Sequence, residues 1–169
     1  MIYNVKVIAN WFLTRMVTDA GDTMSHLKLQ KLLYYAQAWH LAFYNKPLFK
    51  EKIEPWSKGP VVPCIYDKFK DLPFESAINP FKDYFDIKDP DFSDEARHVL
   101  EQVHTTYGEH SAGYLQELAC REFPYRNARK GLGFHEISHG EISHKVMTNY
   151  YRKRLQYGKY TSQKKAIFH

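Results

Sequence analysis

Hydrophobic residues recur at helical spacing along most of the chain, and this pattern predicts a mainly α-helical fold. The strongest pattern begins after Ser25, a good N-cap residue, and ends at Tyr44. From Leu32 onward this predicted helix is apolar on nearly every side, which is typical of a helix buried in the middle of a bundle. His40 lies within the apolar part and is interpreted as a hydrogen-bonded core residue. The sequence therefore predicts a compact helical bundle around one central buried helix.

Shorter helices are predicted on both sides of the central one, with at most a short extended segment near residues 48–56. Ser138 and Glu141 have the spacing of a capping box, so a last helix should start there and run towards residue 151 or 155. The other helices expected from caps, apolar spacing and helix stops cover about residues 4–17, 60–70, 94–107 and 125–129, with one more starting at Ser111.

These elements are expected to form one domain over residues 1–156, followed by a basic tail over residues 157–169 that frays at its end. A chain of 169 residues with 44% hydrophobic residues can bury a substantial core. Residues 72–92 interrupt the helical pattern with three prolines and are interpreted as a surface excursion, with a short helix near residues 81–85. That excursion is either a tolerated insertion or a segment that contacts a partner.

The charge of the chain is compatible with an acidic protein partner or with nucleic acid. The formal net charge is +5 and the sequence pI is about 9.0. A nucleic-acid-binding regulatory protein is therefore an alternative, although basic composition alone speaks only to non-specific attraction. The basic residues gather near the end of the chain, at Arg152, Lys153, Arg154, Lys159, Lys164 and Lys165.

The sequence offers no signal for export or for a membrane. The two cysteines, Cys64 and Cys120, form no disulfide framework, which favours a reducing compartment such as the cytoplasm. No segment approaches the roughly 20 apolar residues that a membrane span needs. No basic leader with a cleavage site is apparent at the N-terminus. We therefore expect a cytoplasmic protein without a membrane partner.

His135, Glu136 and His139 match the HExxH pattern of zinc metalloproteases. In that pattern two imidazoles lie one turn apart on a helix, and the glutamate activates the bound water. Here Gly140 directly follows the second histidine, and Ser138 would place a helix start between the two histidines. A histidine-rich polar loop is the preferred interpretation. A zinc hydrolase using His135 and His139 remains a remote alternative, and no cofactor is expected.

Packing alone does not account for residues 56–63. Trp56 and Lys58 precede the Gly59–Pro60 turn, which places an aromatic ring, a cation and a rigid corner just before a helix. The segment is either a stiff corner between helices or the aromatic and cationic edge of an interface. The pattern of the chain does not decide between these two interpretations.

The central helix and the segment after it resemble the Panacea domain. Residues 27–42, LKLQKLLYYAQAWHLA, are similar to the signature helix of that family. Later echoes include residues 107–108, 111–112 and 128–129, together with Leu115, Leu118, Pro124, Ile137 and Ile142. The similarity continues through residues 46–49, 53–56 and 58–63 to Tyr66.

The resemblance implies a helical protein of bacteria or their phages that acts as an antitoxin. Panacea domains include SocA-like antitoxins, and a related member delivers its toxin to a protease. The expected partner is a cognate toxin, usually encoded by the adjacent gene, with a protease or chaperone as a further partner. No enzymatic activity is expected. This chain has Ala119–Cys120 where the family commonly has a Thr–His pair, and Tyr125 where it commonly has tryptophan.

The segment that carries this resemblance is expected to supply the partner-binding residues. They are expected first in the corner after the central helix and next at the polar start of that helix. The predicted partner-binding residues are Trp56, Lys58, Gly59, Pro60, Tyr66, Lys28 and Lys31.

Overall fold

The computed structural model describes residues 1–18, 23–73 and 75–167. Within these residues the fold is mostly helical with one small sheet, as the hydrophobic pattern predicted. No helix in these ranges is both long and apolar enough to cross a lipid bilayer. The elements are α1 (Val5–Thr18), α2 (His26–Tyr44), β1 (Glu54–Trp56), β2 (Gly59–Val61), α3 (Pro63–Phe69), α4 (Asp94–Tyr107), α5 (Ala112–Arg121), α6 (Phe123–Ala128) and α7 (His144–Ile167).

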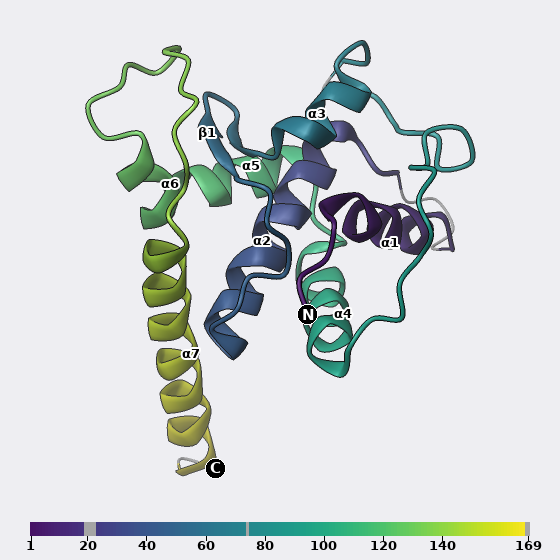
Figure 1. Cartoon of the computed structure of the whole chain (residues 1–169). Coiled ribbons are helices and arrows are strands. Elements are labelled where there is room, and N and C mark those ends of the chain that lie inside the picture. Colours follow the sequence, from purple (N-terminus) through teal and green to yellow (C-terminus); the bar gives the residue numbers. More distant parts are fainter. Residues whose placement is uncertain (19–22, 74, 168–169) are drawn as a thin grey trace.

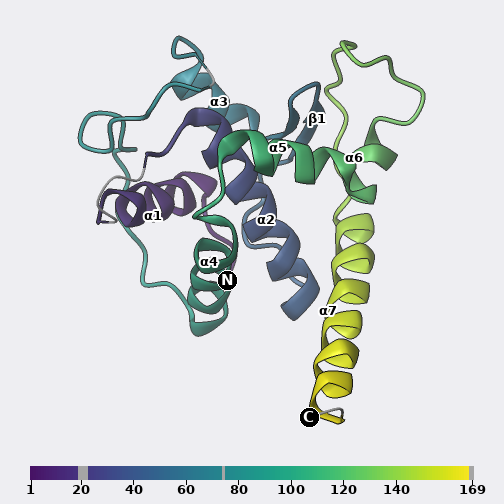
Figure 2. The same cartoon turned by 180° about the vertical axis from the view of Figure 1, so that it is seen from behind.

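Helix α2 is the centre of the molecule. Figure 1 shows it running through the middle, with α7 along one side and α1 and α4 on the other. Figure 2 shows α5 and α6 crossing its back towards α7. The Ser25 hydroxyl accepts a hydrogen bond from the Lys28 N–H, and Asn45 ends the helix in the left-handed conformation at φ 56°. The predicted buried central helix is confirmed.

The polar residues of α2 are buried because they bind the main chain of the segment that follows. The Gln37 side chain accepts from the Leu48 N–H at 2.7 Å and donates to the Phe49 carbonyl at 2.8 Å. The side-chain Oε1 of Gln30 accepts from the Val62 N–H at 2.7 Å. His40 Nδ1 lies 2.6 Å from the Lys46 carbonyl, which confirms that His40 is a hydrogen-bonded core residue. One helix face thus holds the main chain after it in place.

Strands β1 and β2 form an antiparallel hairpin in which Trp56 lies opposite Gly59. Gly59 has φ +98°, a conformation that favours glycine. Helix α3 begins at Pro63 and not near residue 60 as predicted, because residues 59–61 pair with β1. Pro63 lies in the first turn of α3, where no intrahelical partner is needed for its nitrogen.

The excursion over residues 72–92 is anchored to α1 and to the segment just before α2. The buried Asn10 amide donates to the Phe85 carbonyl and accepts from the Phe85 N–H, each at 2.9 Å. The Ile78 N–H donates to the Met24 carbonyl at 2.7 Å, and Ile78 and Phe85 are both buried. The helix predicted near residues 81–85 is absent there, because these residues form turns.

The last helix begins later and runs further than predicted. Residues 136–143 are irregular, and α7 starts at His144 instead of Ser138. The reason is tertiary: Ile142 is fully buried, and its N–H donates to the Ile53 carbonyl at 2.8 Å. Gly158 does not end α7, which continues to Ile167. A glycine inside a helix lowers the stability of the helix by only about 1 kcal/mol relative to alanine. The fraying of residues 157–169 stays a prediction.

Candidate partner-binding site

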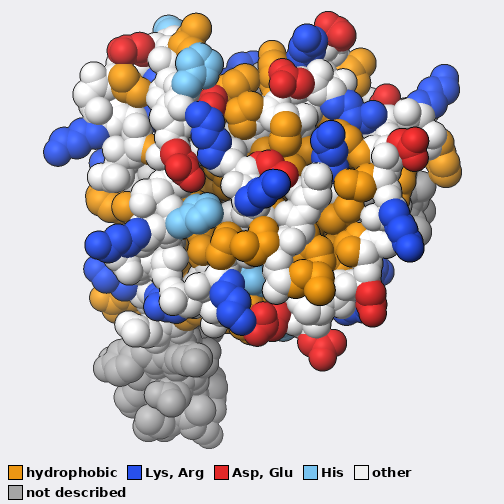
Figure 3. Space-filling view, in the orientation of Figure 1, with side chains coloured by type: hydrophobic (Ala, Val, Ile, Leu, Met, Phe, Trp, Pro, Cys, Tyr) orange, Lys and Arg blue, Asp and Glu red, His pale blue; other side chains and the backbone are white. Residues whose placement is uncertain are grey.

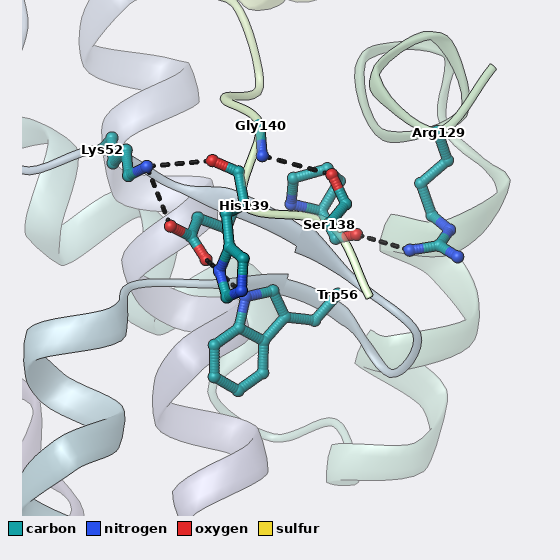
Figure 4. A network of polar contacts seen from close by, with 8 residues as sticks. Lys52, Trp56, Arg129, Ser138, His139 and Gly140 are labelled. Carbon is teal, nitrogen blue, oxygen red and sulfur yellow. Dashed lines mark hydrogen bonds and ion pairs between the residues drawn. The ribbon is translucent and has the colours of Figure 1, made fainter. Parts of the chain in front are cut away.

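The β1–β2 hairpin and the irregular segment before α7 face each other across a cleft. The cleft has a volume of about 370 Å³ and is lined by Trp56, Ser57 and residues 135–139. Figure 4 shows Trp56 from the hairpin lying below His139 and Ser138, with Arg129 reaching in from the side. We call this cleft and its two walls the hairpin–loop cleft.

Glu54 is the buried anion that joins the two walls. Its Oε2 accepts from the Trp56 indole Nε1 at 2.7 Å and lies 3.2 Å from His139 Nδ1. Its Oε1 lies 2.9 Å from Lys52 Nζ, which also donates to the His139 carbonyl at 2.9 Å. Burial alone would raise the pKa of Glu54, but the hydrogen bonds from Trp56, Lys52 and His139 hold it below its ordinary value.

Arg129 shapes the opposite wall. Its Nη1 donates to the Pro55 carbonyl at 2.7 Å, so it binds the hairpin. Its Nη2 donates to the carbonyls of Gly133 at 2.6 Å and Glu136 at 3.0 Å, so it also gathers the loop. Tyr125 adds a second contact from α6, donating from its hydroxyl to the Trp56 carbonyl at 2.6 Å. The cleft is therefore held by side chains whose own positions are set by hydrogen bonds.

Large apolar side chains lie exposed around this cleft. Ile137 is 79% exposed and Phe134 is 76% exposed, although both follow directly on the residues that Arg129 holds. Figure 3 shows hydrophobic side chains between charged ones on the upper part of this face, where the hairpin and loop lie in Figure 1. Exposed apolar groups gathered at a cleft are typical of an interaction site.

The part of the chain that contains the hairpin also matches a known family. A family model described as antitoxin SocA-like, Panacea domain, matches residues 29–124, which is more than half of the chain. The chain belongs to this Panacea-domain family. No curated protein and no solved structure matches the chain. The matched residues of the Panacea domain include the hairpin wall of the cleft, whereas residues 133–140 and α7 lie beyond them.

Three of the predicted partner-binding residues of the Panacea domain lie at or near the surface. Trp56 is half-buried and lines the cleft. Tyr66 is half-buried too, and its ring centroid lies 4.7 Å from that of Trp56. Lys58, at the hairpin tip, has a side chain that is 51% exposed, with Nζ 3.8 Å from Glu75. The structure therefore brings Trp56 and Tyr66 together and leaves Lys58 beside them.

The other four, Lys28, Lys31, Gly59 and Pro60, are buried, so their expected surface position is wrong. Lys31 is fully buried, and its Nζ donates to the Pro60 carbonyl at 3.0 Å. Burial lowers the pKa of Lys31 to about 7. The polar side chains at the start of α2 face inward because they bind main-chain groups of Pro60 and Val62, some 30 positions later. The helical spacing of apolar residues carries no information on such long-range bonds.

The structure of the Panacea-domain chain does not give His135 and His139 the geometry of a zinc protease. Both lie in the stretch before α7 that is not helical, so they share no helix face. His139 contacts Glu54 instead. Within the described residues no group of three His, Cys, Asp or Glu side chains could hold a metal ion.

A second buried charge cluster joins α7 to the rest of the molecule. Glu122, between α5 and α6, accepts hydrogen bonds from Tyr34 at 3.3 Å and Arg154 at 2.8 Å, and also from the Tyr151 hydroxyl. Burial raises the pKa of Glu122, against the opposing effect of Tyr151 and Arg154. Arg154 is thus paired with a buried carboxylate although its own side chain is 41% exposed, and Arg152 donates to the Ala42 carbonyl at 3.2 Å. Part of the basic patch predicted for nucleic acid therefore serves packing.

Sequence reasoning missed the loop wall of the cleft. Arg129 and Ile137 were noted only as echoes of the family, and Phe134 was not singled out. Phe134 and Ile137 are large apolar residues in a segment near Gly131 and Gly133 that has no helical period. That pattern alone does not predict their exposure, because Ile78 and Phe85 in the equally irregular 72–92 excursion are buried.

Proposed function

We propose that this protein is an antitoxin that neutralises a cognate toxin by direct protein–protein binding at the hairpin–loop cleft. The observation that carries the proposal is the pair of exposed side chains, Ile137 and Phe134, beside a cleft lined by Trp56. Membership of the antitoxin SocA-like family supports the kind of partner. We place this activity in the cytoplasm, in keeping with the free thiols of Cys64 and Cys120.

Rigidity of the site supports this function. Glu54 and Arg129 hold the two walls by hydrogen bonds to side chains and carbonyls, so the cleft exists before a partner arrives. A preformed site loses less conformational entropy on binding, which favours tight stoichiometric capture. Aromatic anchors such as Trp56 at the centre of a site typically carry much of the binding energy.

Neutralisation by simple capture is the form of the function that the geometry supports best. The toxin would be the product of the adjacent gene and would be blocked as long as the complex persists. Delivery of the bound toxin to a protease is a variant that uses the same contact and adds a second partner. Both forms require a direct complex, so the first experiment tests that complex.

Co-expression with the neighbouring gene tests the proposal. The neighbouring gene alone should stop growth, and co-expression of this protein should restore growth and yield a complex of the two proteins on size-exclusion chromatography. The Ile137→Asp variant should restore growth poorly, whereas Ile2→Asp should behave like the wild type because Ile2 is exposed elsewhere. A harmless neighbouring gene, or rescue without any complex, would contradict the proposal.

A further inference from the structure

Resting on the proposed function, we infer that the hairpin–loop cleft receives an acidic segment of the toxin that carries one bulky apolar side chain. The apolar side chain enters between Trp56 and Ile137, and the carboxylates lie over the cations of α6 and the loop. The inference names the chemistry of the partner, which neither the fold nor the family provides.

The apolar half of this inference follows from the lining of the cleft. Trp56 forms one wall and is held by its indole N–H on Glu54, so its ring presents a face in a defined position. Ile137 forms the other wall and is 79% exposed. A volume of about 370 Å³ admits an aromatic or branched aliphatic side chain. Covering both walls with such a side chain removes apolar surface from water and stabilises the complex.

The acidic half follows from charges that have no counter-ion. The stretch 123–139 contains the cations Arg126, Arg129 and Lys130 but only one carboxylate, Glu136. All hydrogen bonds of Arg129 go to neutral carbonyls, so its charge is not compensated by a carboxylate. Arg126 and Lys130 are exposed, and neither has an ion pair among the described residues.

These cations adjoin Arg129, the residue that binds both walls of the cleft. Arg126 and Arg129 are three positions apart at the end of α6 and share a side of that helix. Arg129 itself binds both walls, through the carbonyls of Pro55 and Glu136. Lys130 is the next residue along the chain. Positive charge at the cleft edge attracts a negative partner and repels a positive one.

Two other occupants fit these observations less well. A second copy of this chain would bring the same uncompensated cations to the interface, and like charges there are unfavourable. Single-stranded nucleic acid could stack on Trp56 and Phe134, but a cleft of about 370 Å³ takes one ring and not the run of successive bases that gives such binding its strength. An acidic polypeptide with an apolar anchor matches both the charge and the lining.

The test uses the full ¹⁵N-labelled chain and four probes in low-salt buffer. Three are 12-residue peptides: glutamate-rich with one central phenylalanine, the same with alanine for phenylalanine, and the same with lysines for glutamates. The fourth is a 12-nucleotide oligothymidine. The first peptide should shift the Trp56 indole N–H and the Ile137 amide signals, whereas both altered peptides should bind at least tenfold more weakly and the oligothymidine should leave these signals unmoved.

Charge reversal supplies the matched control. Arg126→Glu with Lys130→Glu should weaken binding of the glutamate-rich phenylalanine peptide at least tenfold. Lys82→Glu with Lys88→Glu, the same change of charge on exposed residues of the 72–92 excursion, should leave it unchanged. An equal loss of peptide affinity in both double variants would show that only the net charge of the protein matters, and it would overturn the inference.

Other outcomes would overturn it as well: no shift with any probe at millimolar concentration, stronger shifts with the lysine peptide or the oligothymidine, or equal binding of the alanine peptide. The result is separable from the proposed function. Peptide binding without rescue in the co-expression experiment would contradict the antitoxin role alone. Rescue without preference for the acidic peptide would contradict this inference alone.

Discussion

At the scale of single residues, Gly59 is under two constraints at once. Its φ of +98° is rarely adopted by residues with a side chain, and a Cβ there would lie 2.9 Å from Lys31 Cε. We predict that Gly59→Ala lowers the free energy of unfolding by about 1–3 kcal/mol, measured by urea denaturation. Gly113→Ala is the control, because a Cβ at this helical position meets nothing within 4 Å. Equal stability of the two variants would contradict this account of the hairpin.

Lys31 should make the stability of the fold depend on pH. Burial lowers the pKa of Lys31 from 10.5 to about 7, so between these values the unfolded chain binds a proton that the folded chain does not. The contribution of Lys31 to the free energy of unfolding therefore rises with pH over this interval. Guanidinium denaturation at pH 7, 8 and 9 should show the wild type gaining stability relative to Lys31→Met. A difference between the two proteins that stays constant with pH would contradict the burial of this amine.

At the scale of elements, the Glu122 cluster is a buried polar link between α7 and the rest of the fold. Glu122→Ala removes the acceptor of Tyr34, Tyr151 and Arg154, two of which are fully buried tyrosines. We expect a loss of about 2–3 kcal/mol, since Arg154 is partly exposed and can regain water.

Glu117 provides a matched control for this variant. Glu117 pairs with Arg121 one helical turn away, and both side chains are exposed. Replacing Glu117 with alanine should cost less than about 1 kcal/mol, because exposed ion pairs contribute little. Thermal denaturation followed by circular dichroism measures both variants. A similar loss for the two glutamates would mean that the Glu122 cluster does not hold α7.

The elements differ in how far the sequence could predict them. The apolar residues of α2 and the caps at Ser25 and Ser111 act locally, so their pattern predicted those helices. The start of α7 could not be predicted in this way. Ser138 has capping-box spacing, but the burial of Ile142 and its bond to the Ile53 carbonyl keep this stretch extended beside the hairpin. A long-range contact overrides a local signal there.

At the scale of the whole molecule, the candidate site was half predictable. Trp56 and Tyr66 stand out as aromatic residues beside a rigid turn, so the hairpin wall could be chosen from the sequence. The loop wall depends on Arg129, which collects carbonyls from segments before and after it in the chain. The link from this wall to the hairpin exists only after folding, because Arg129 and Pro55 lie 74 residues apart in the sequence.

Helix α2 carries the residues that resemble the family signature, although most of its side chains are buried and do not form the contact surface. The polar signature residues Gln30 and Lys31 are buried, and they hold residues 60–62 in the position that aims the hairpin. The hairpin then meets the loop that Arg129 gathers. Under the proposed function, these buried residues fix the shape of the cleft, and the exposed residues around it contact the toxin.

Titration calorimetry of the purified protein with the product of the adjacent gene, the proposed toxin, tests the central claim most directly. The wild type should bind with one-to-one stoichiometry. Ile137→Asp should weaken binding at least tenfold, because it places a carboxylate in the apolar wall and this carboxylate has to be desolvated when the partner binds. Ile2→Asp, at an apolar residue 56% exposed away from the cleft, should bind like the wild type. Undiminished binding of Ile137→Asp, or no binding of the wild type, would contradict the claim that this cleft captures the toxin.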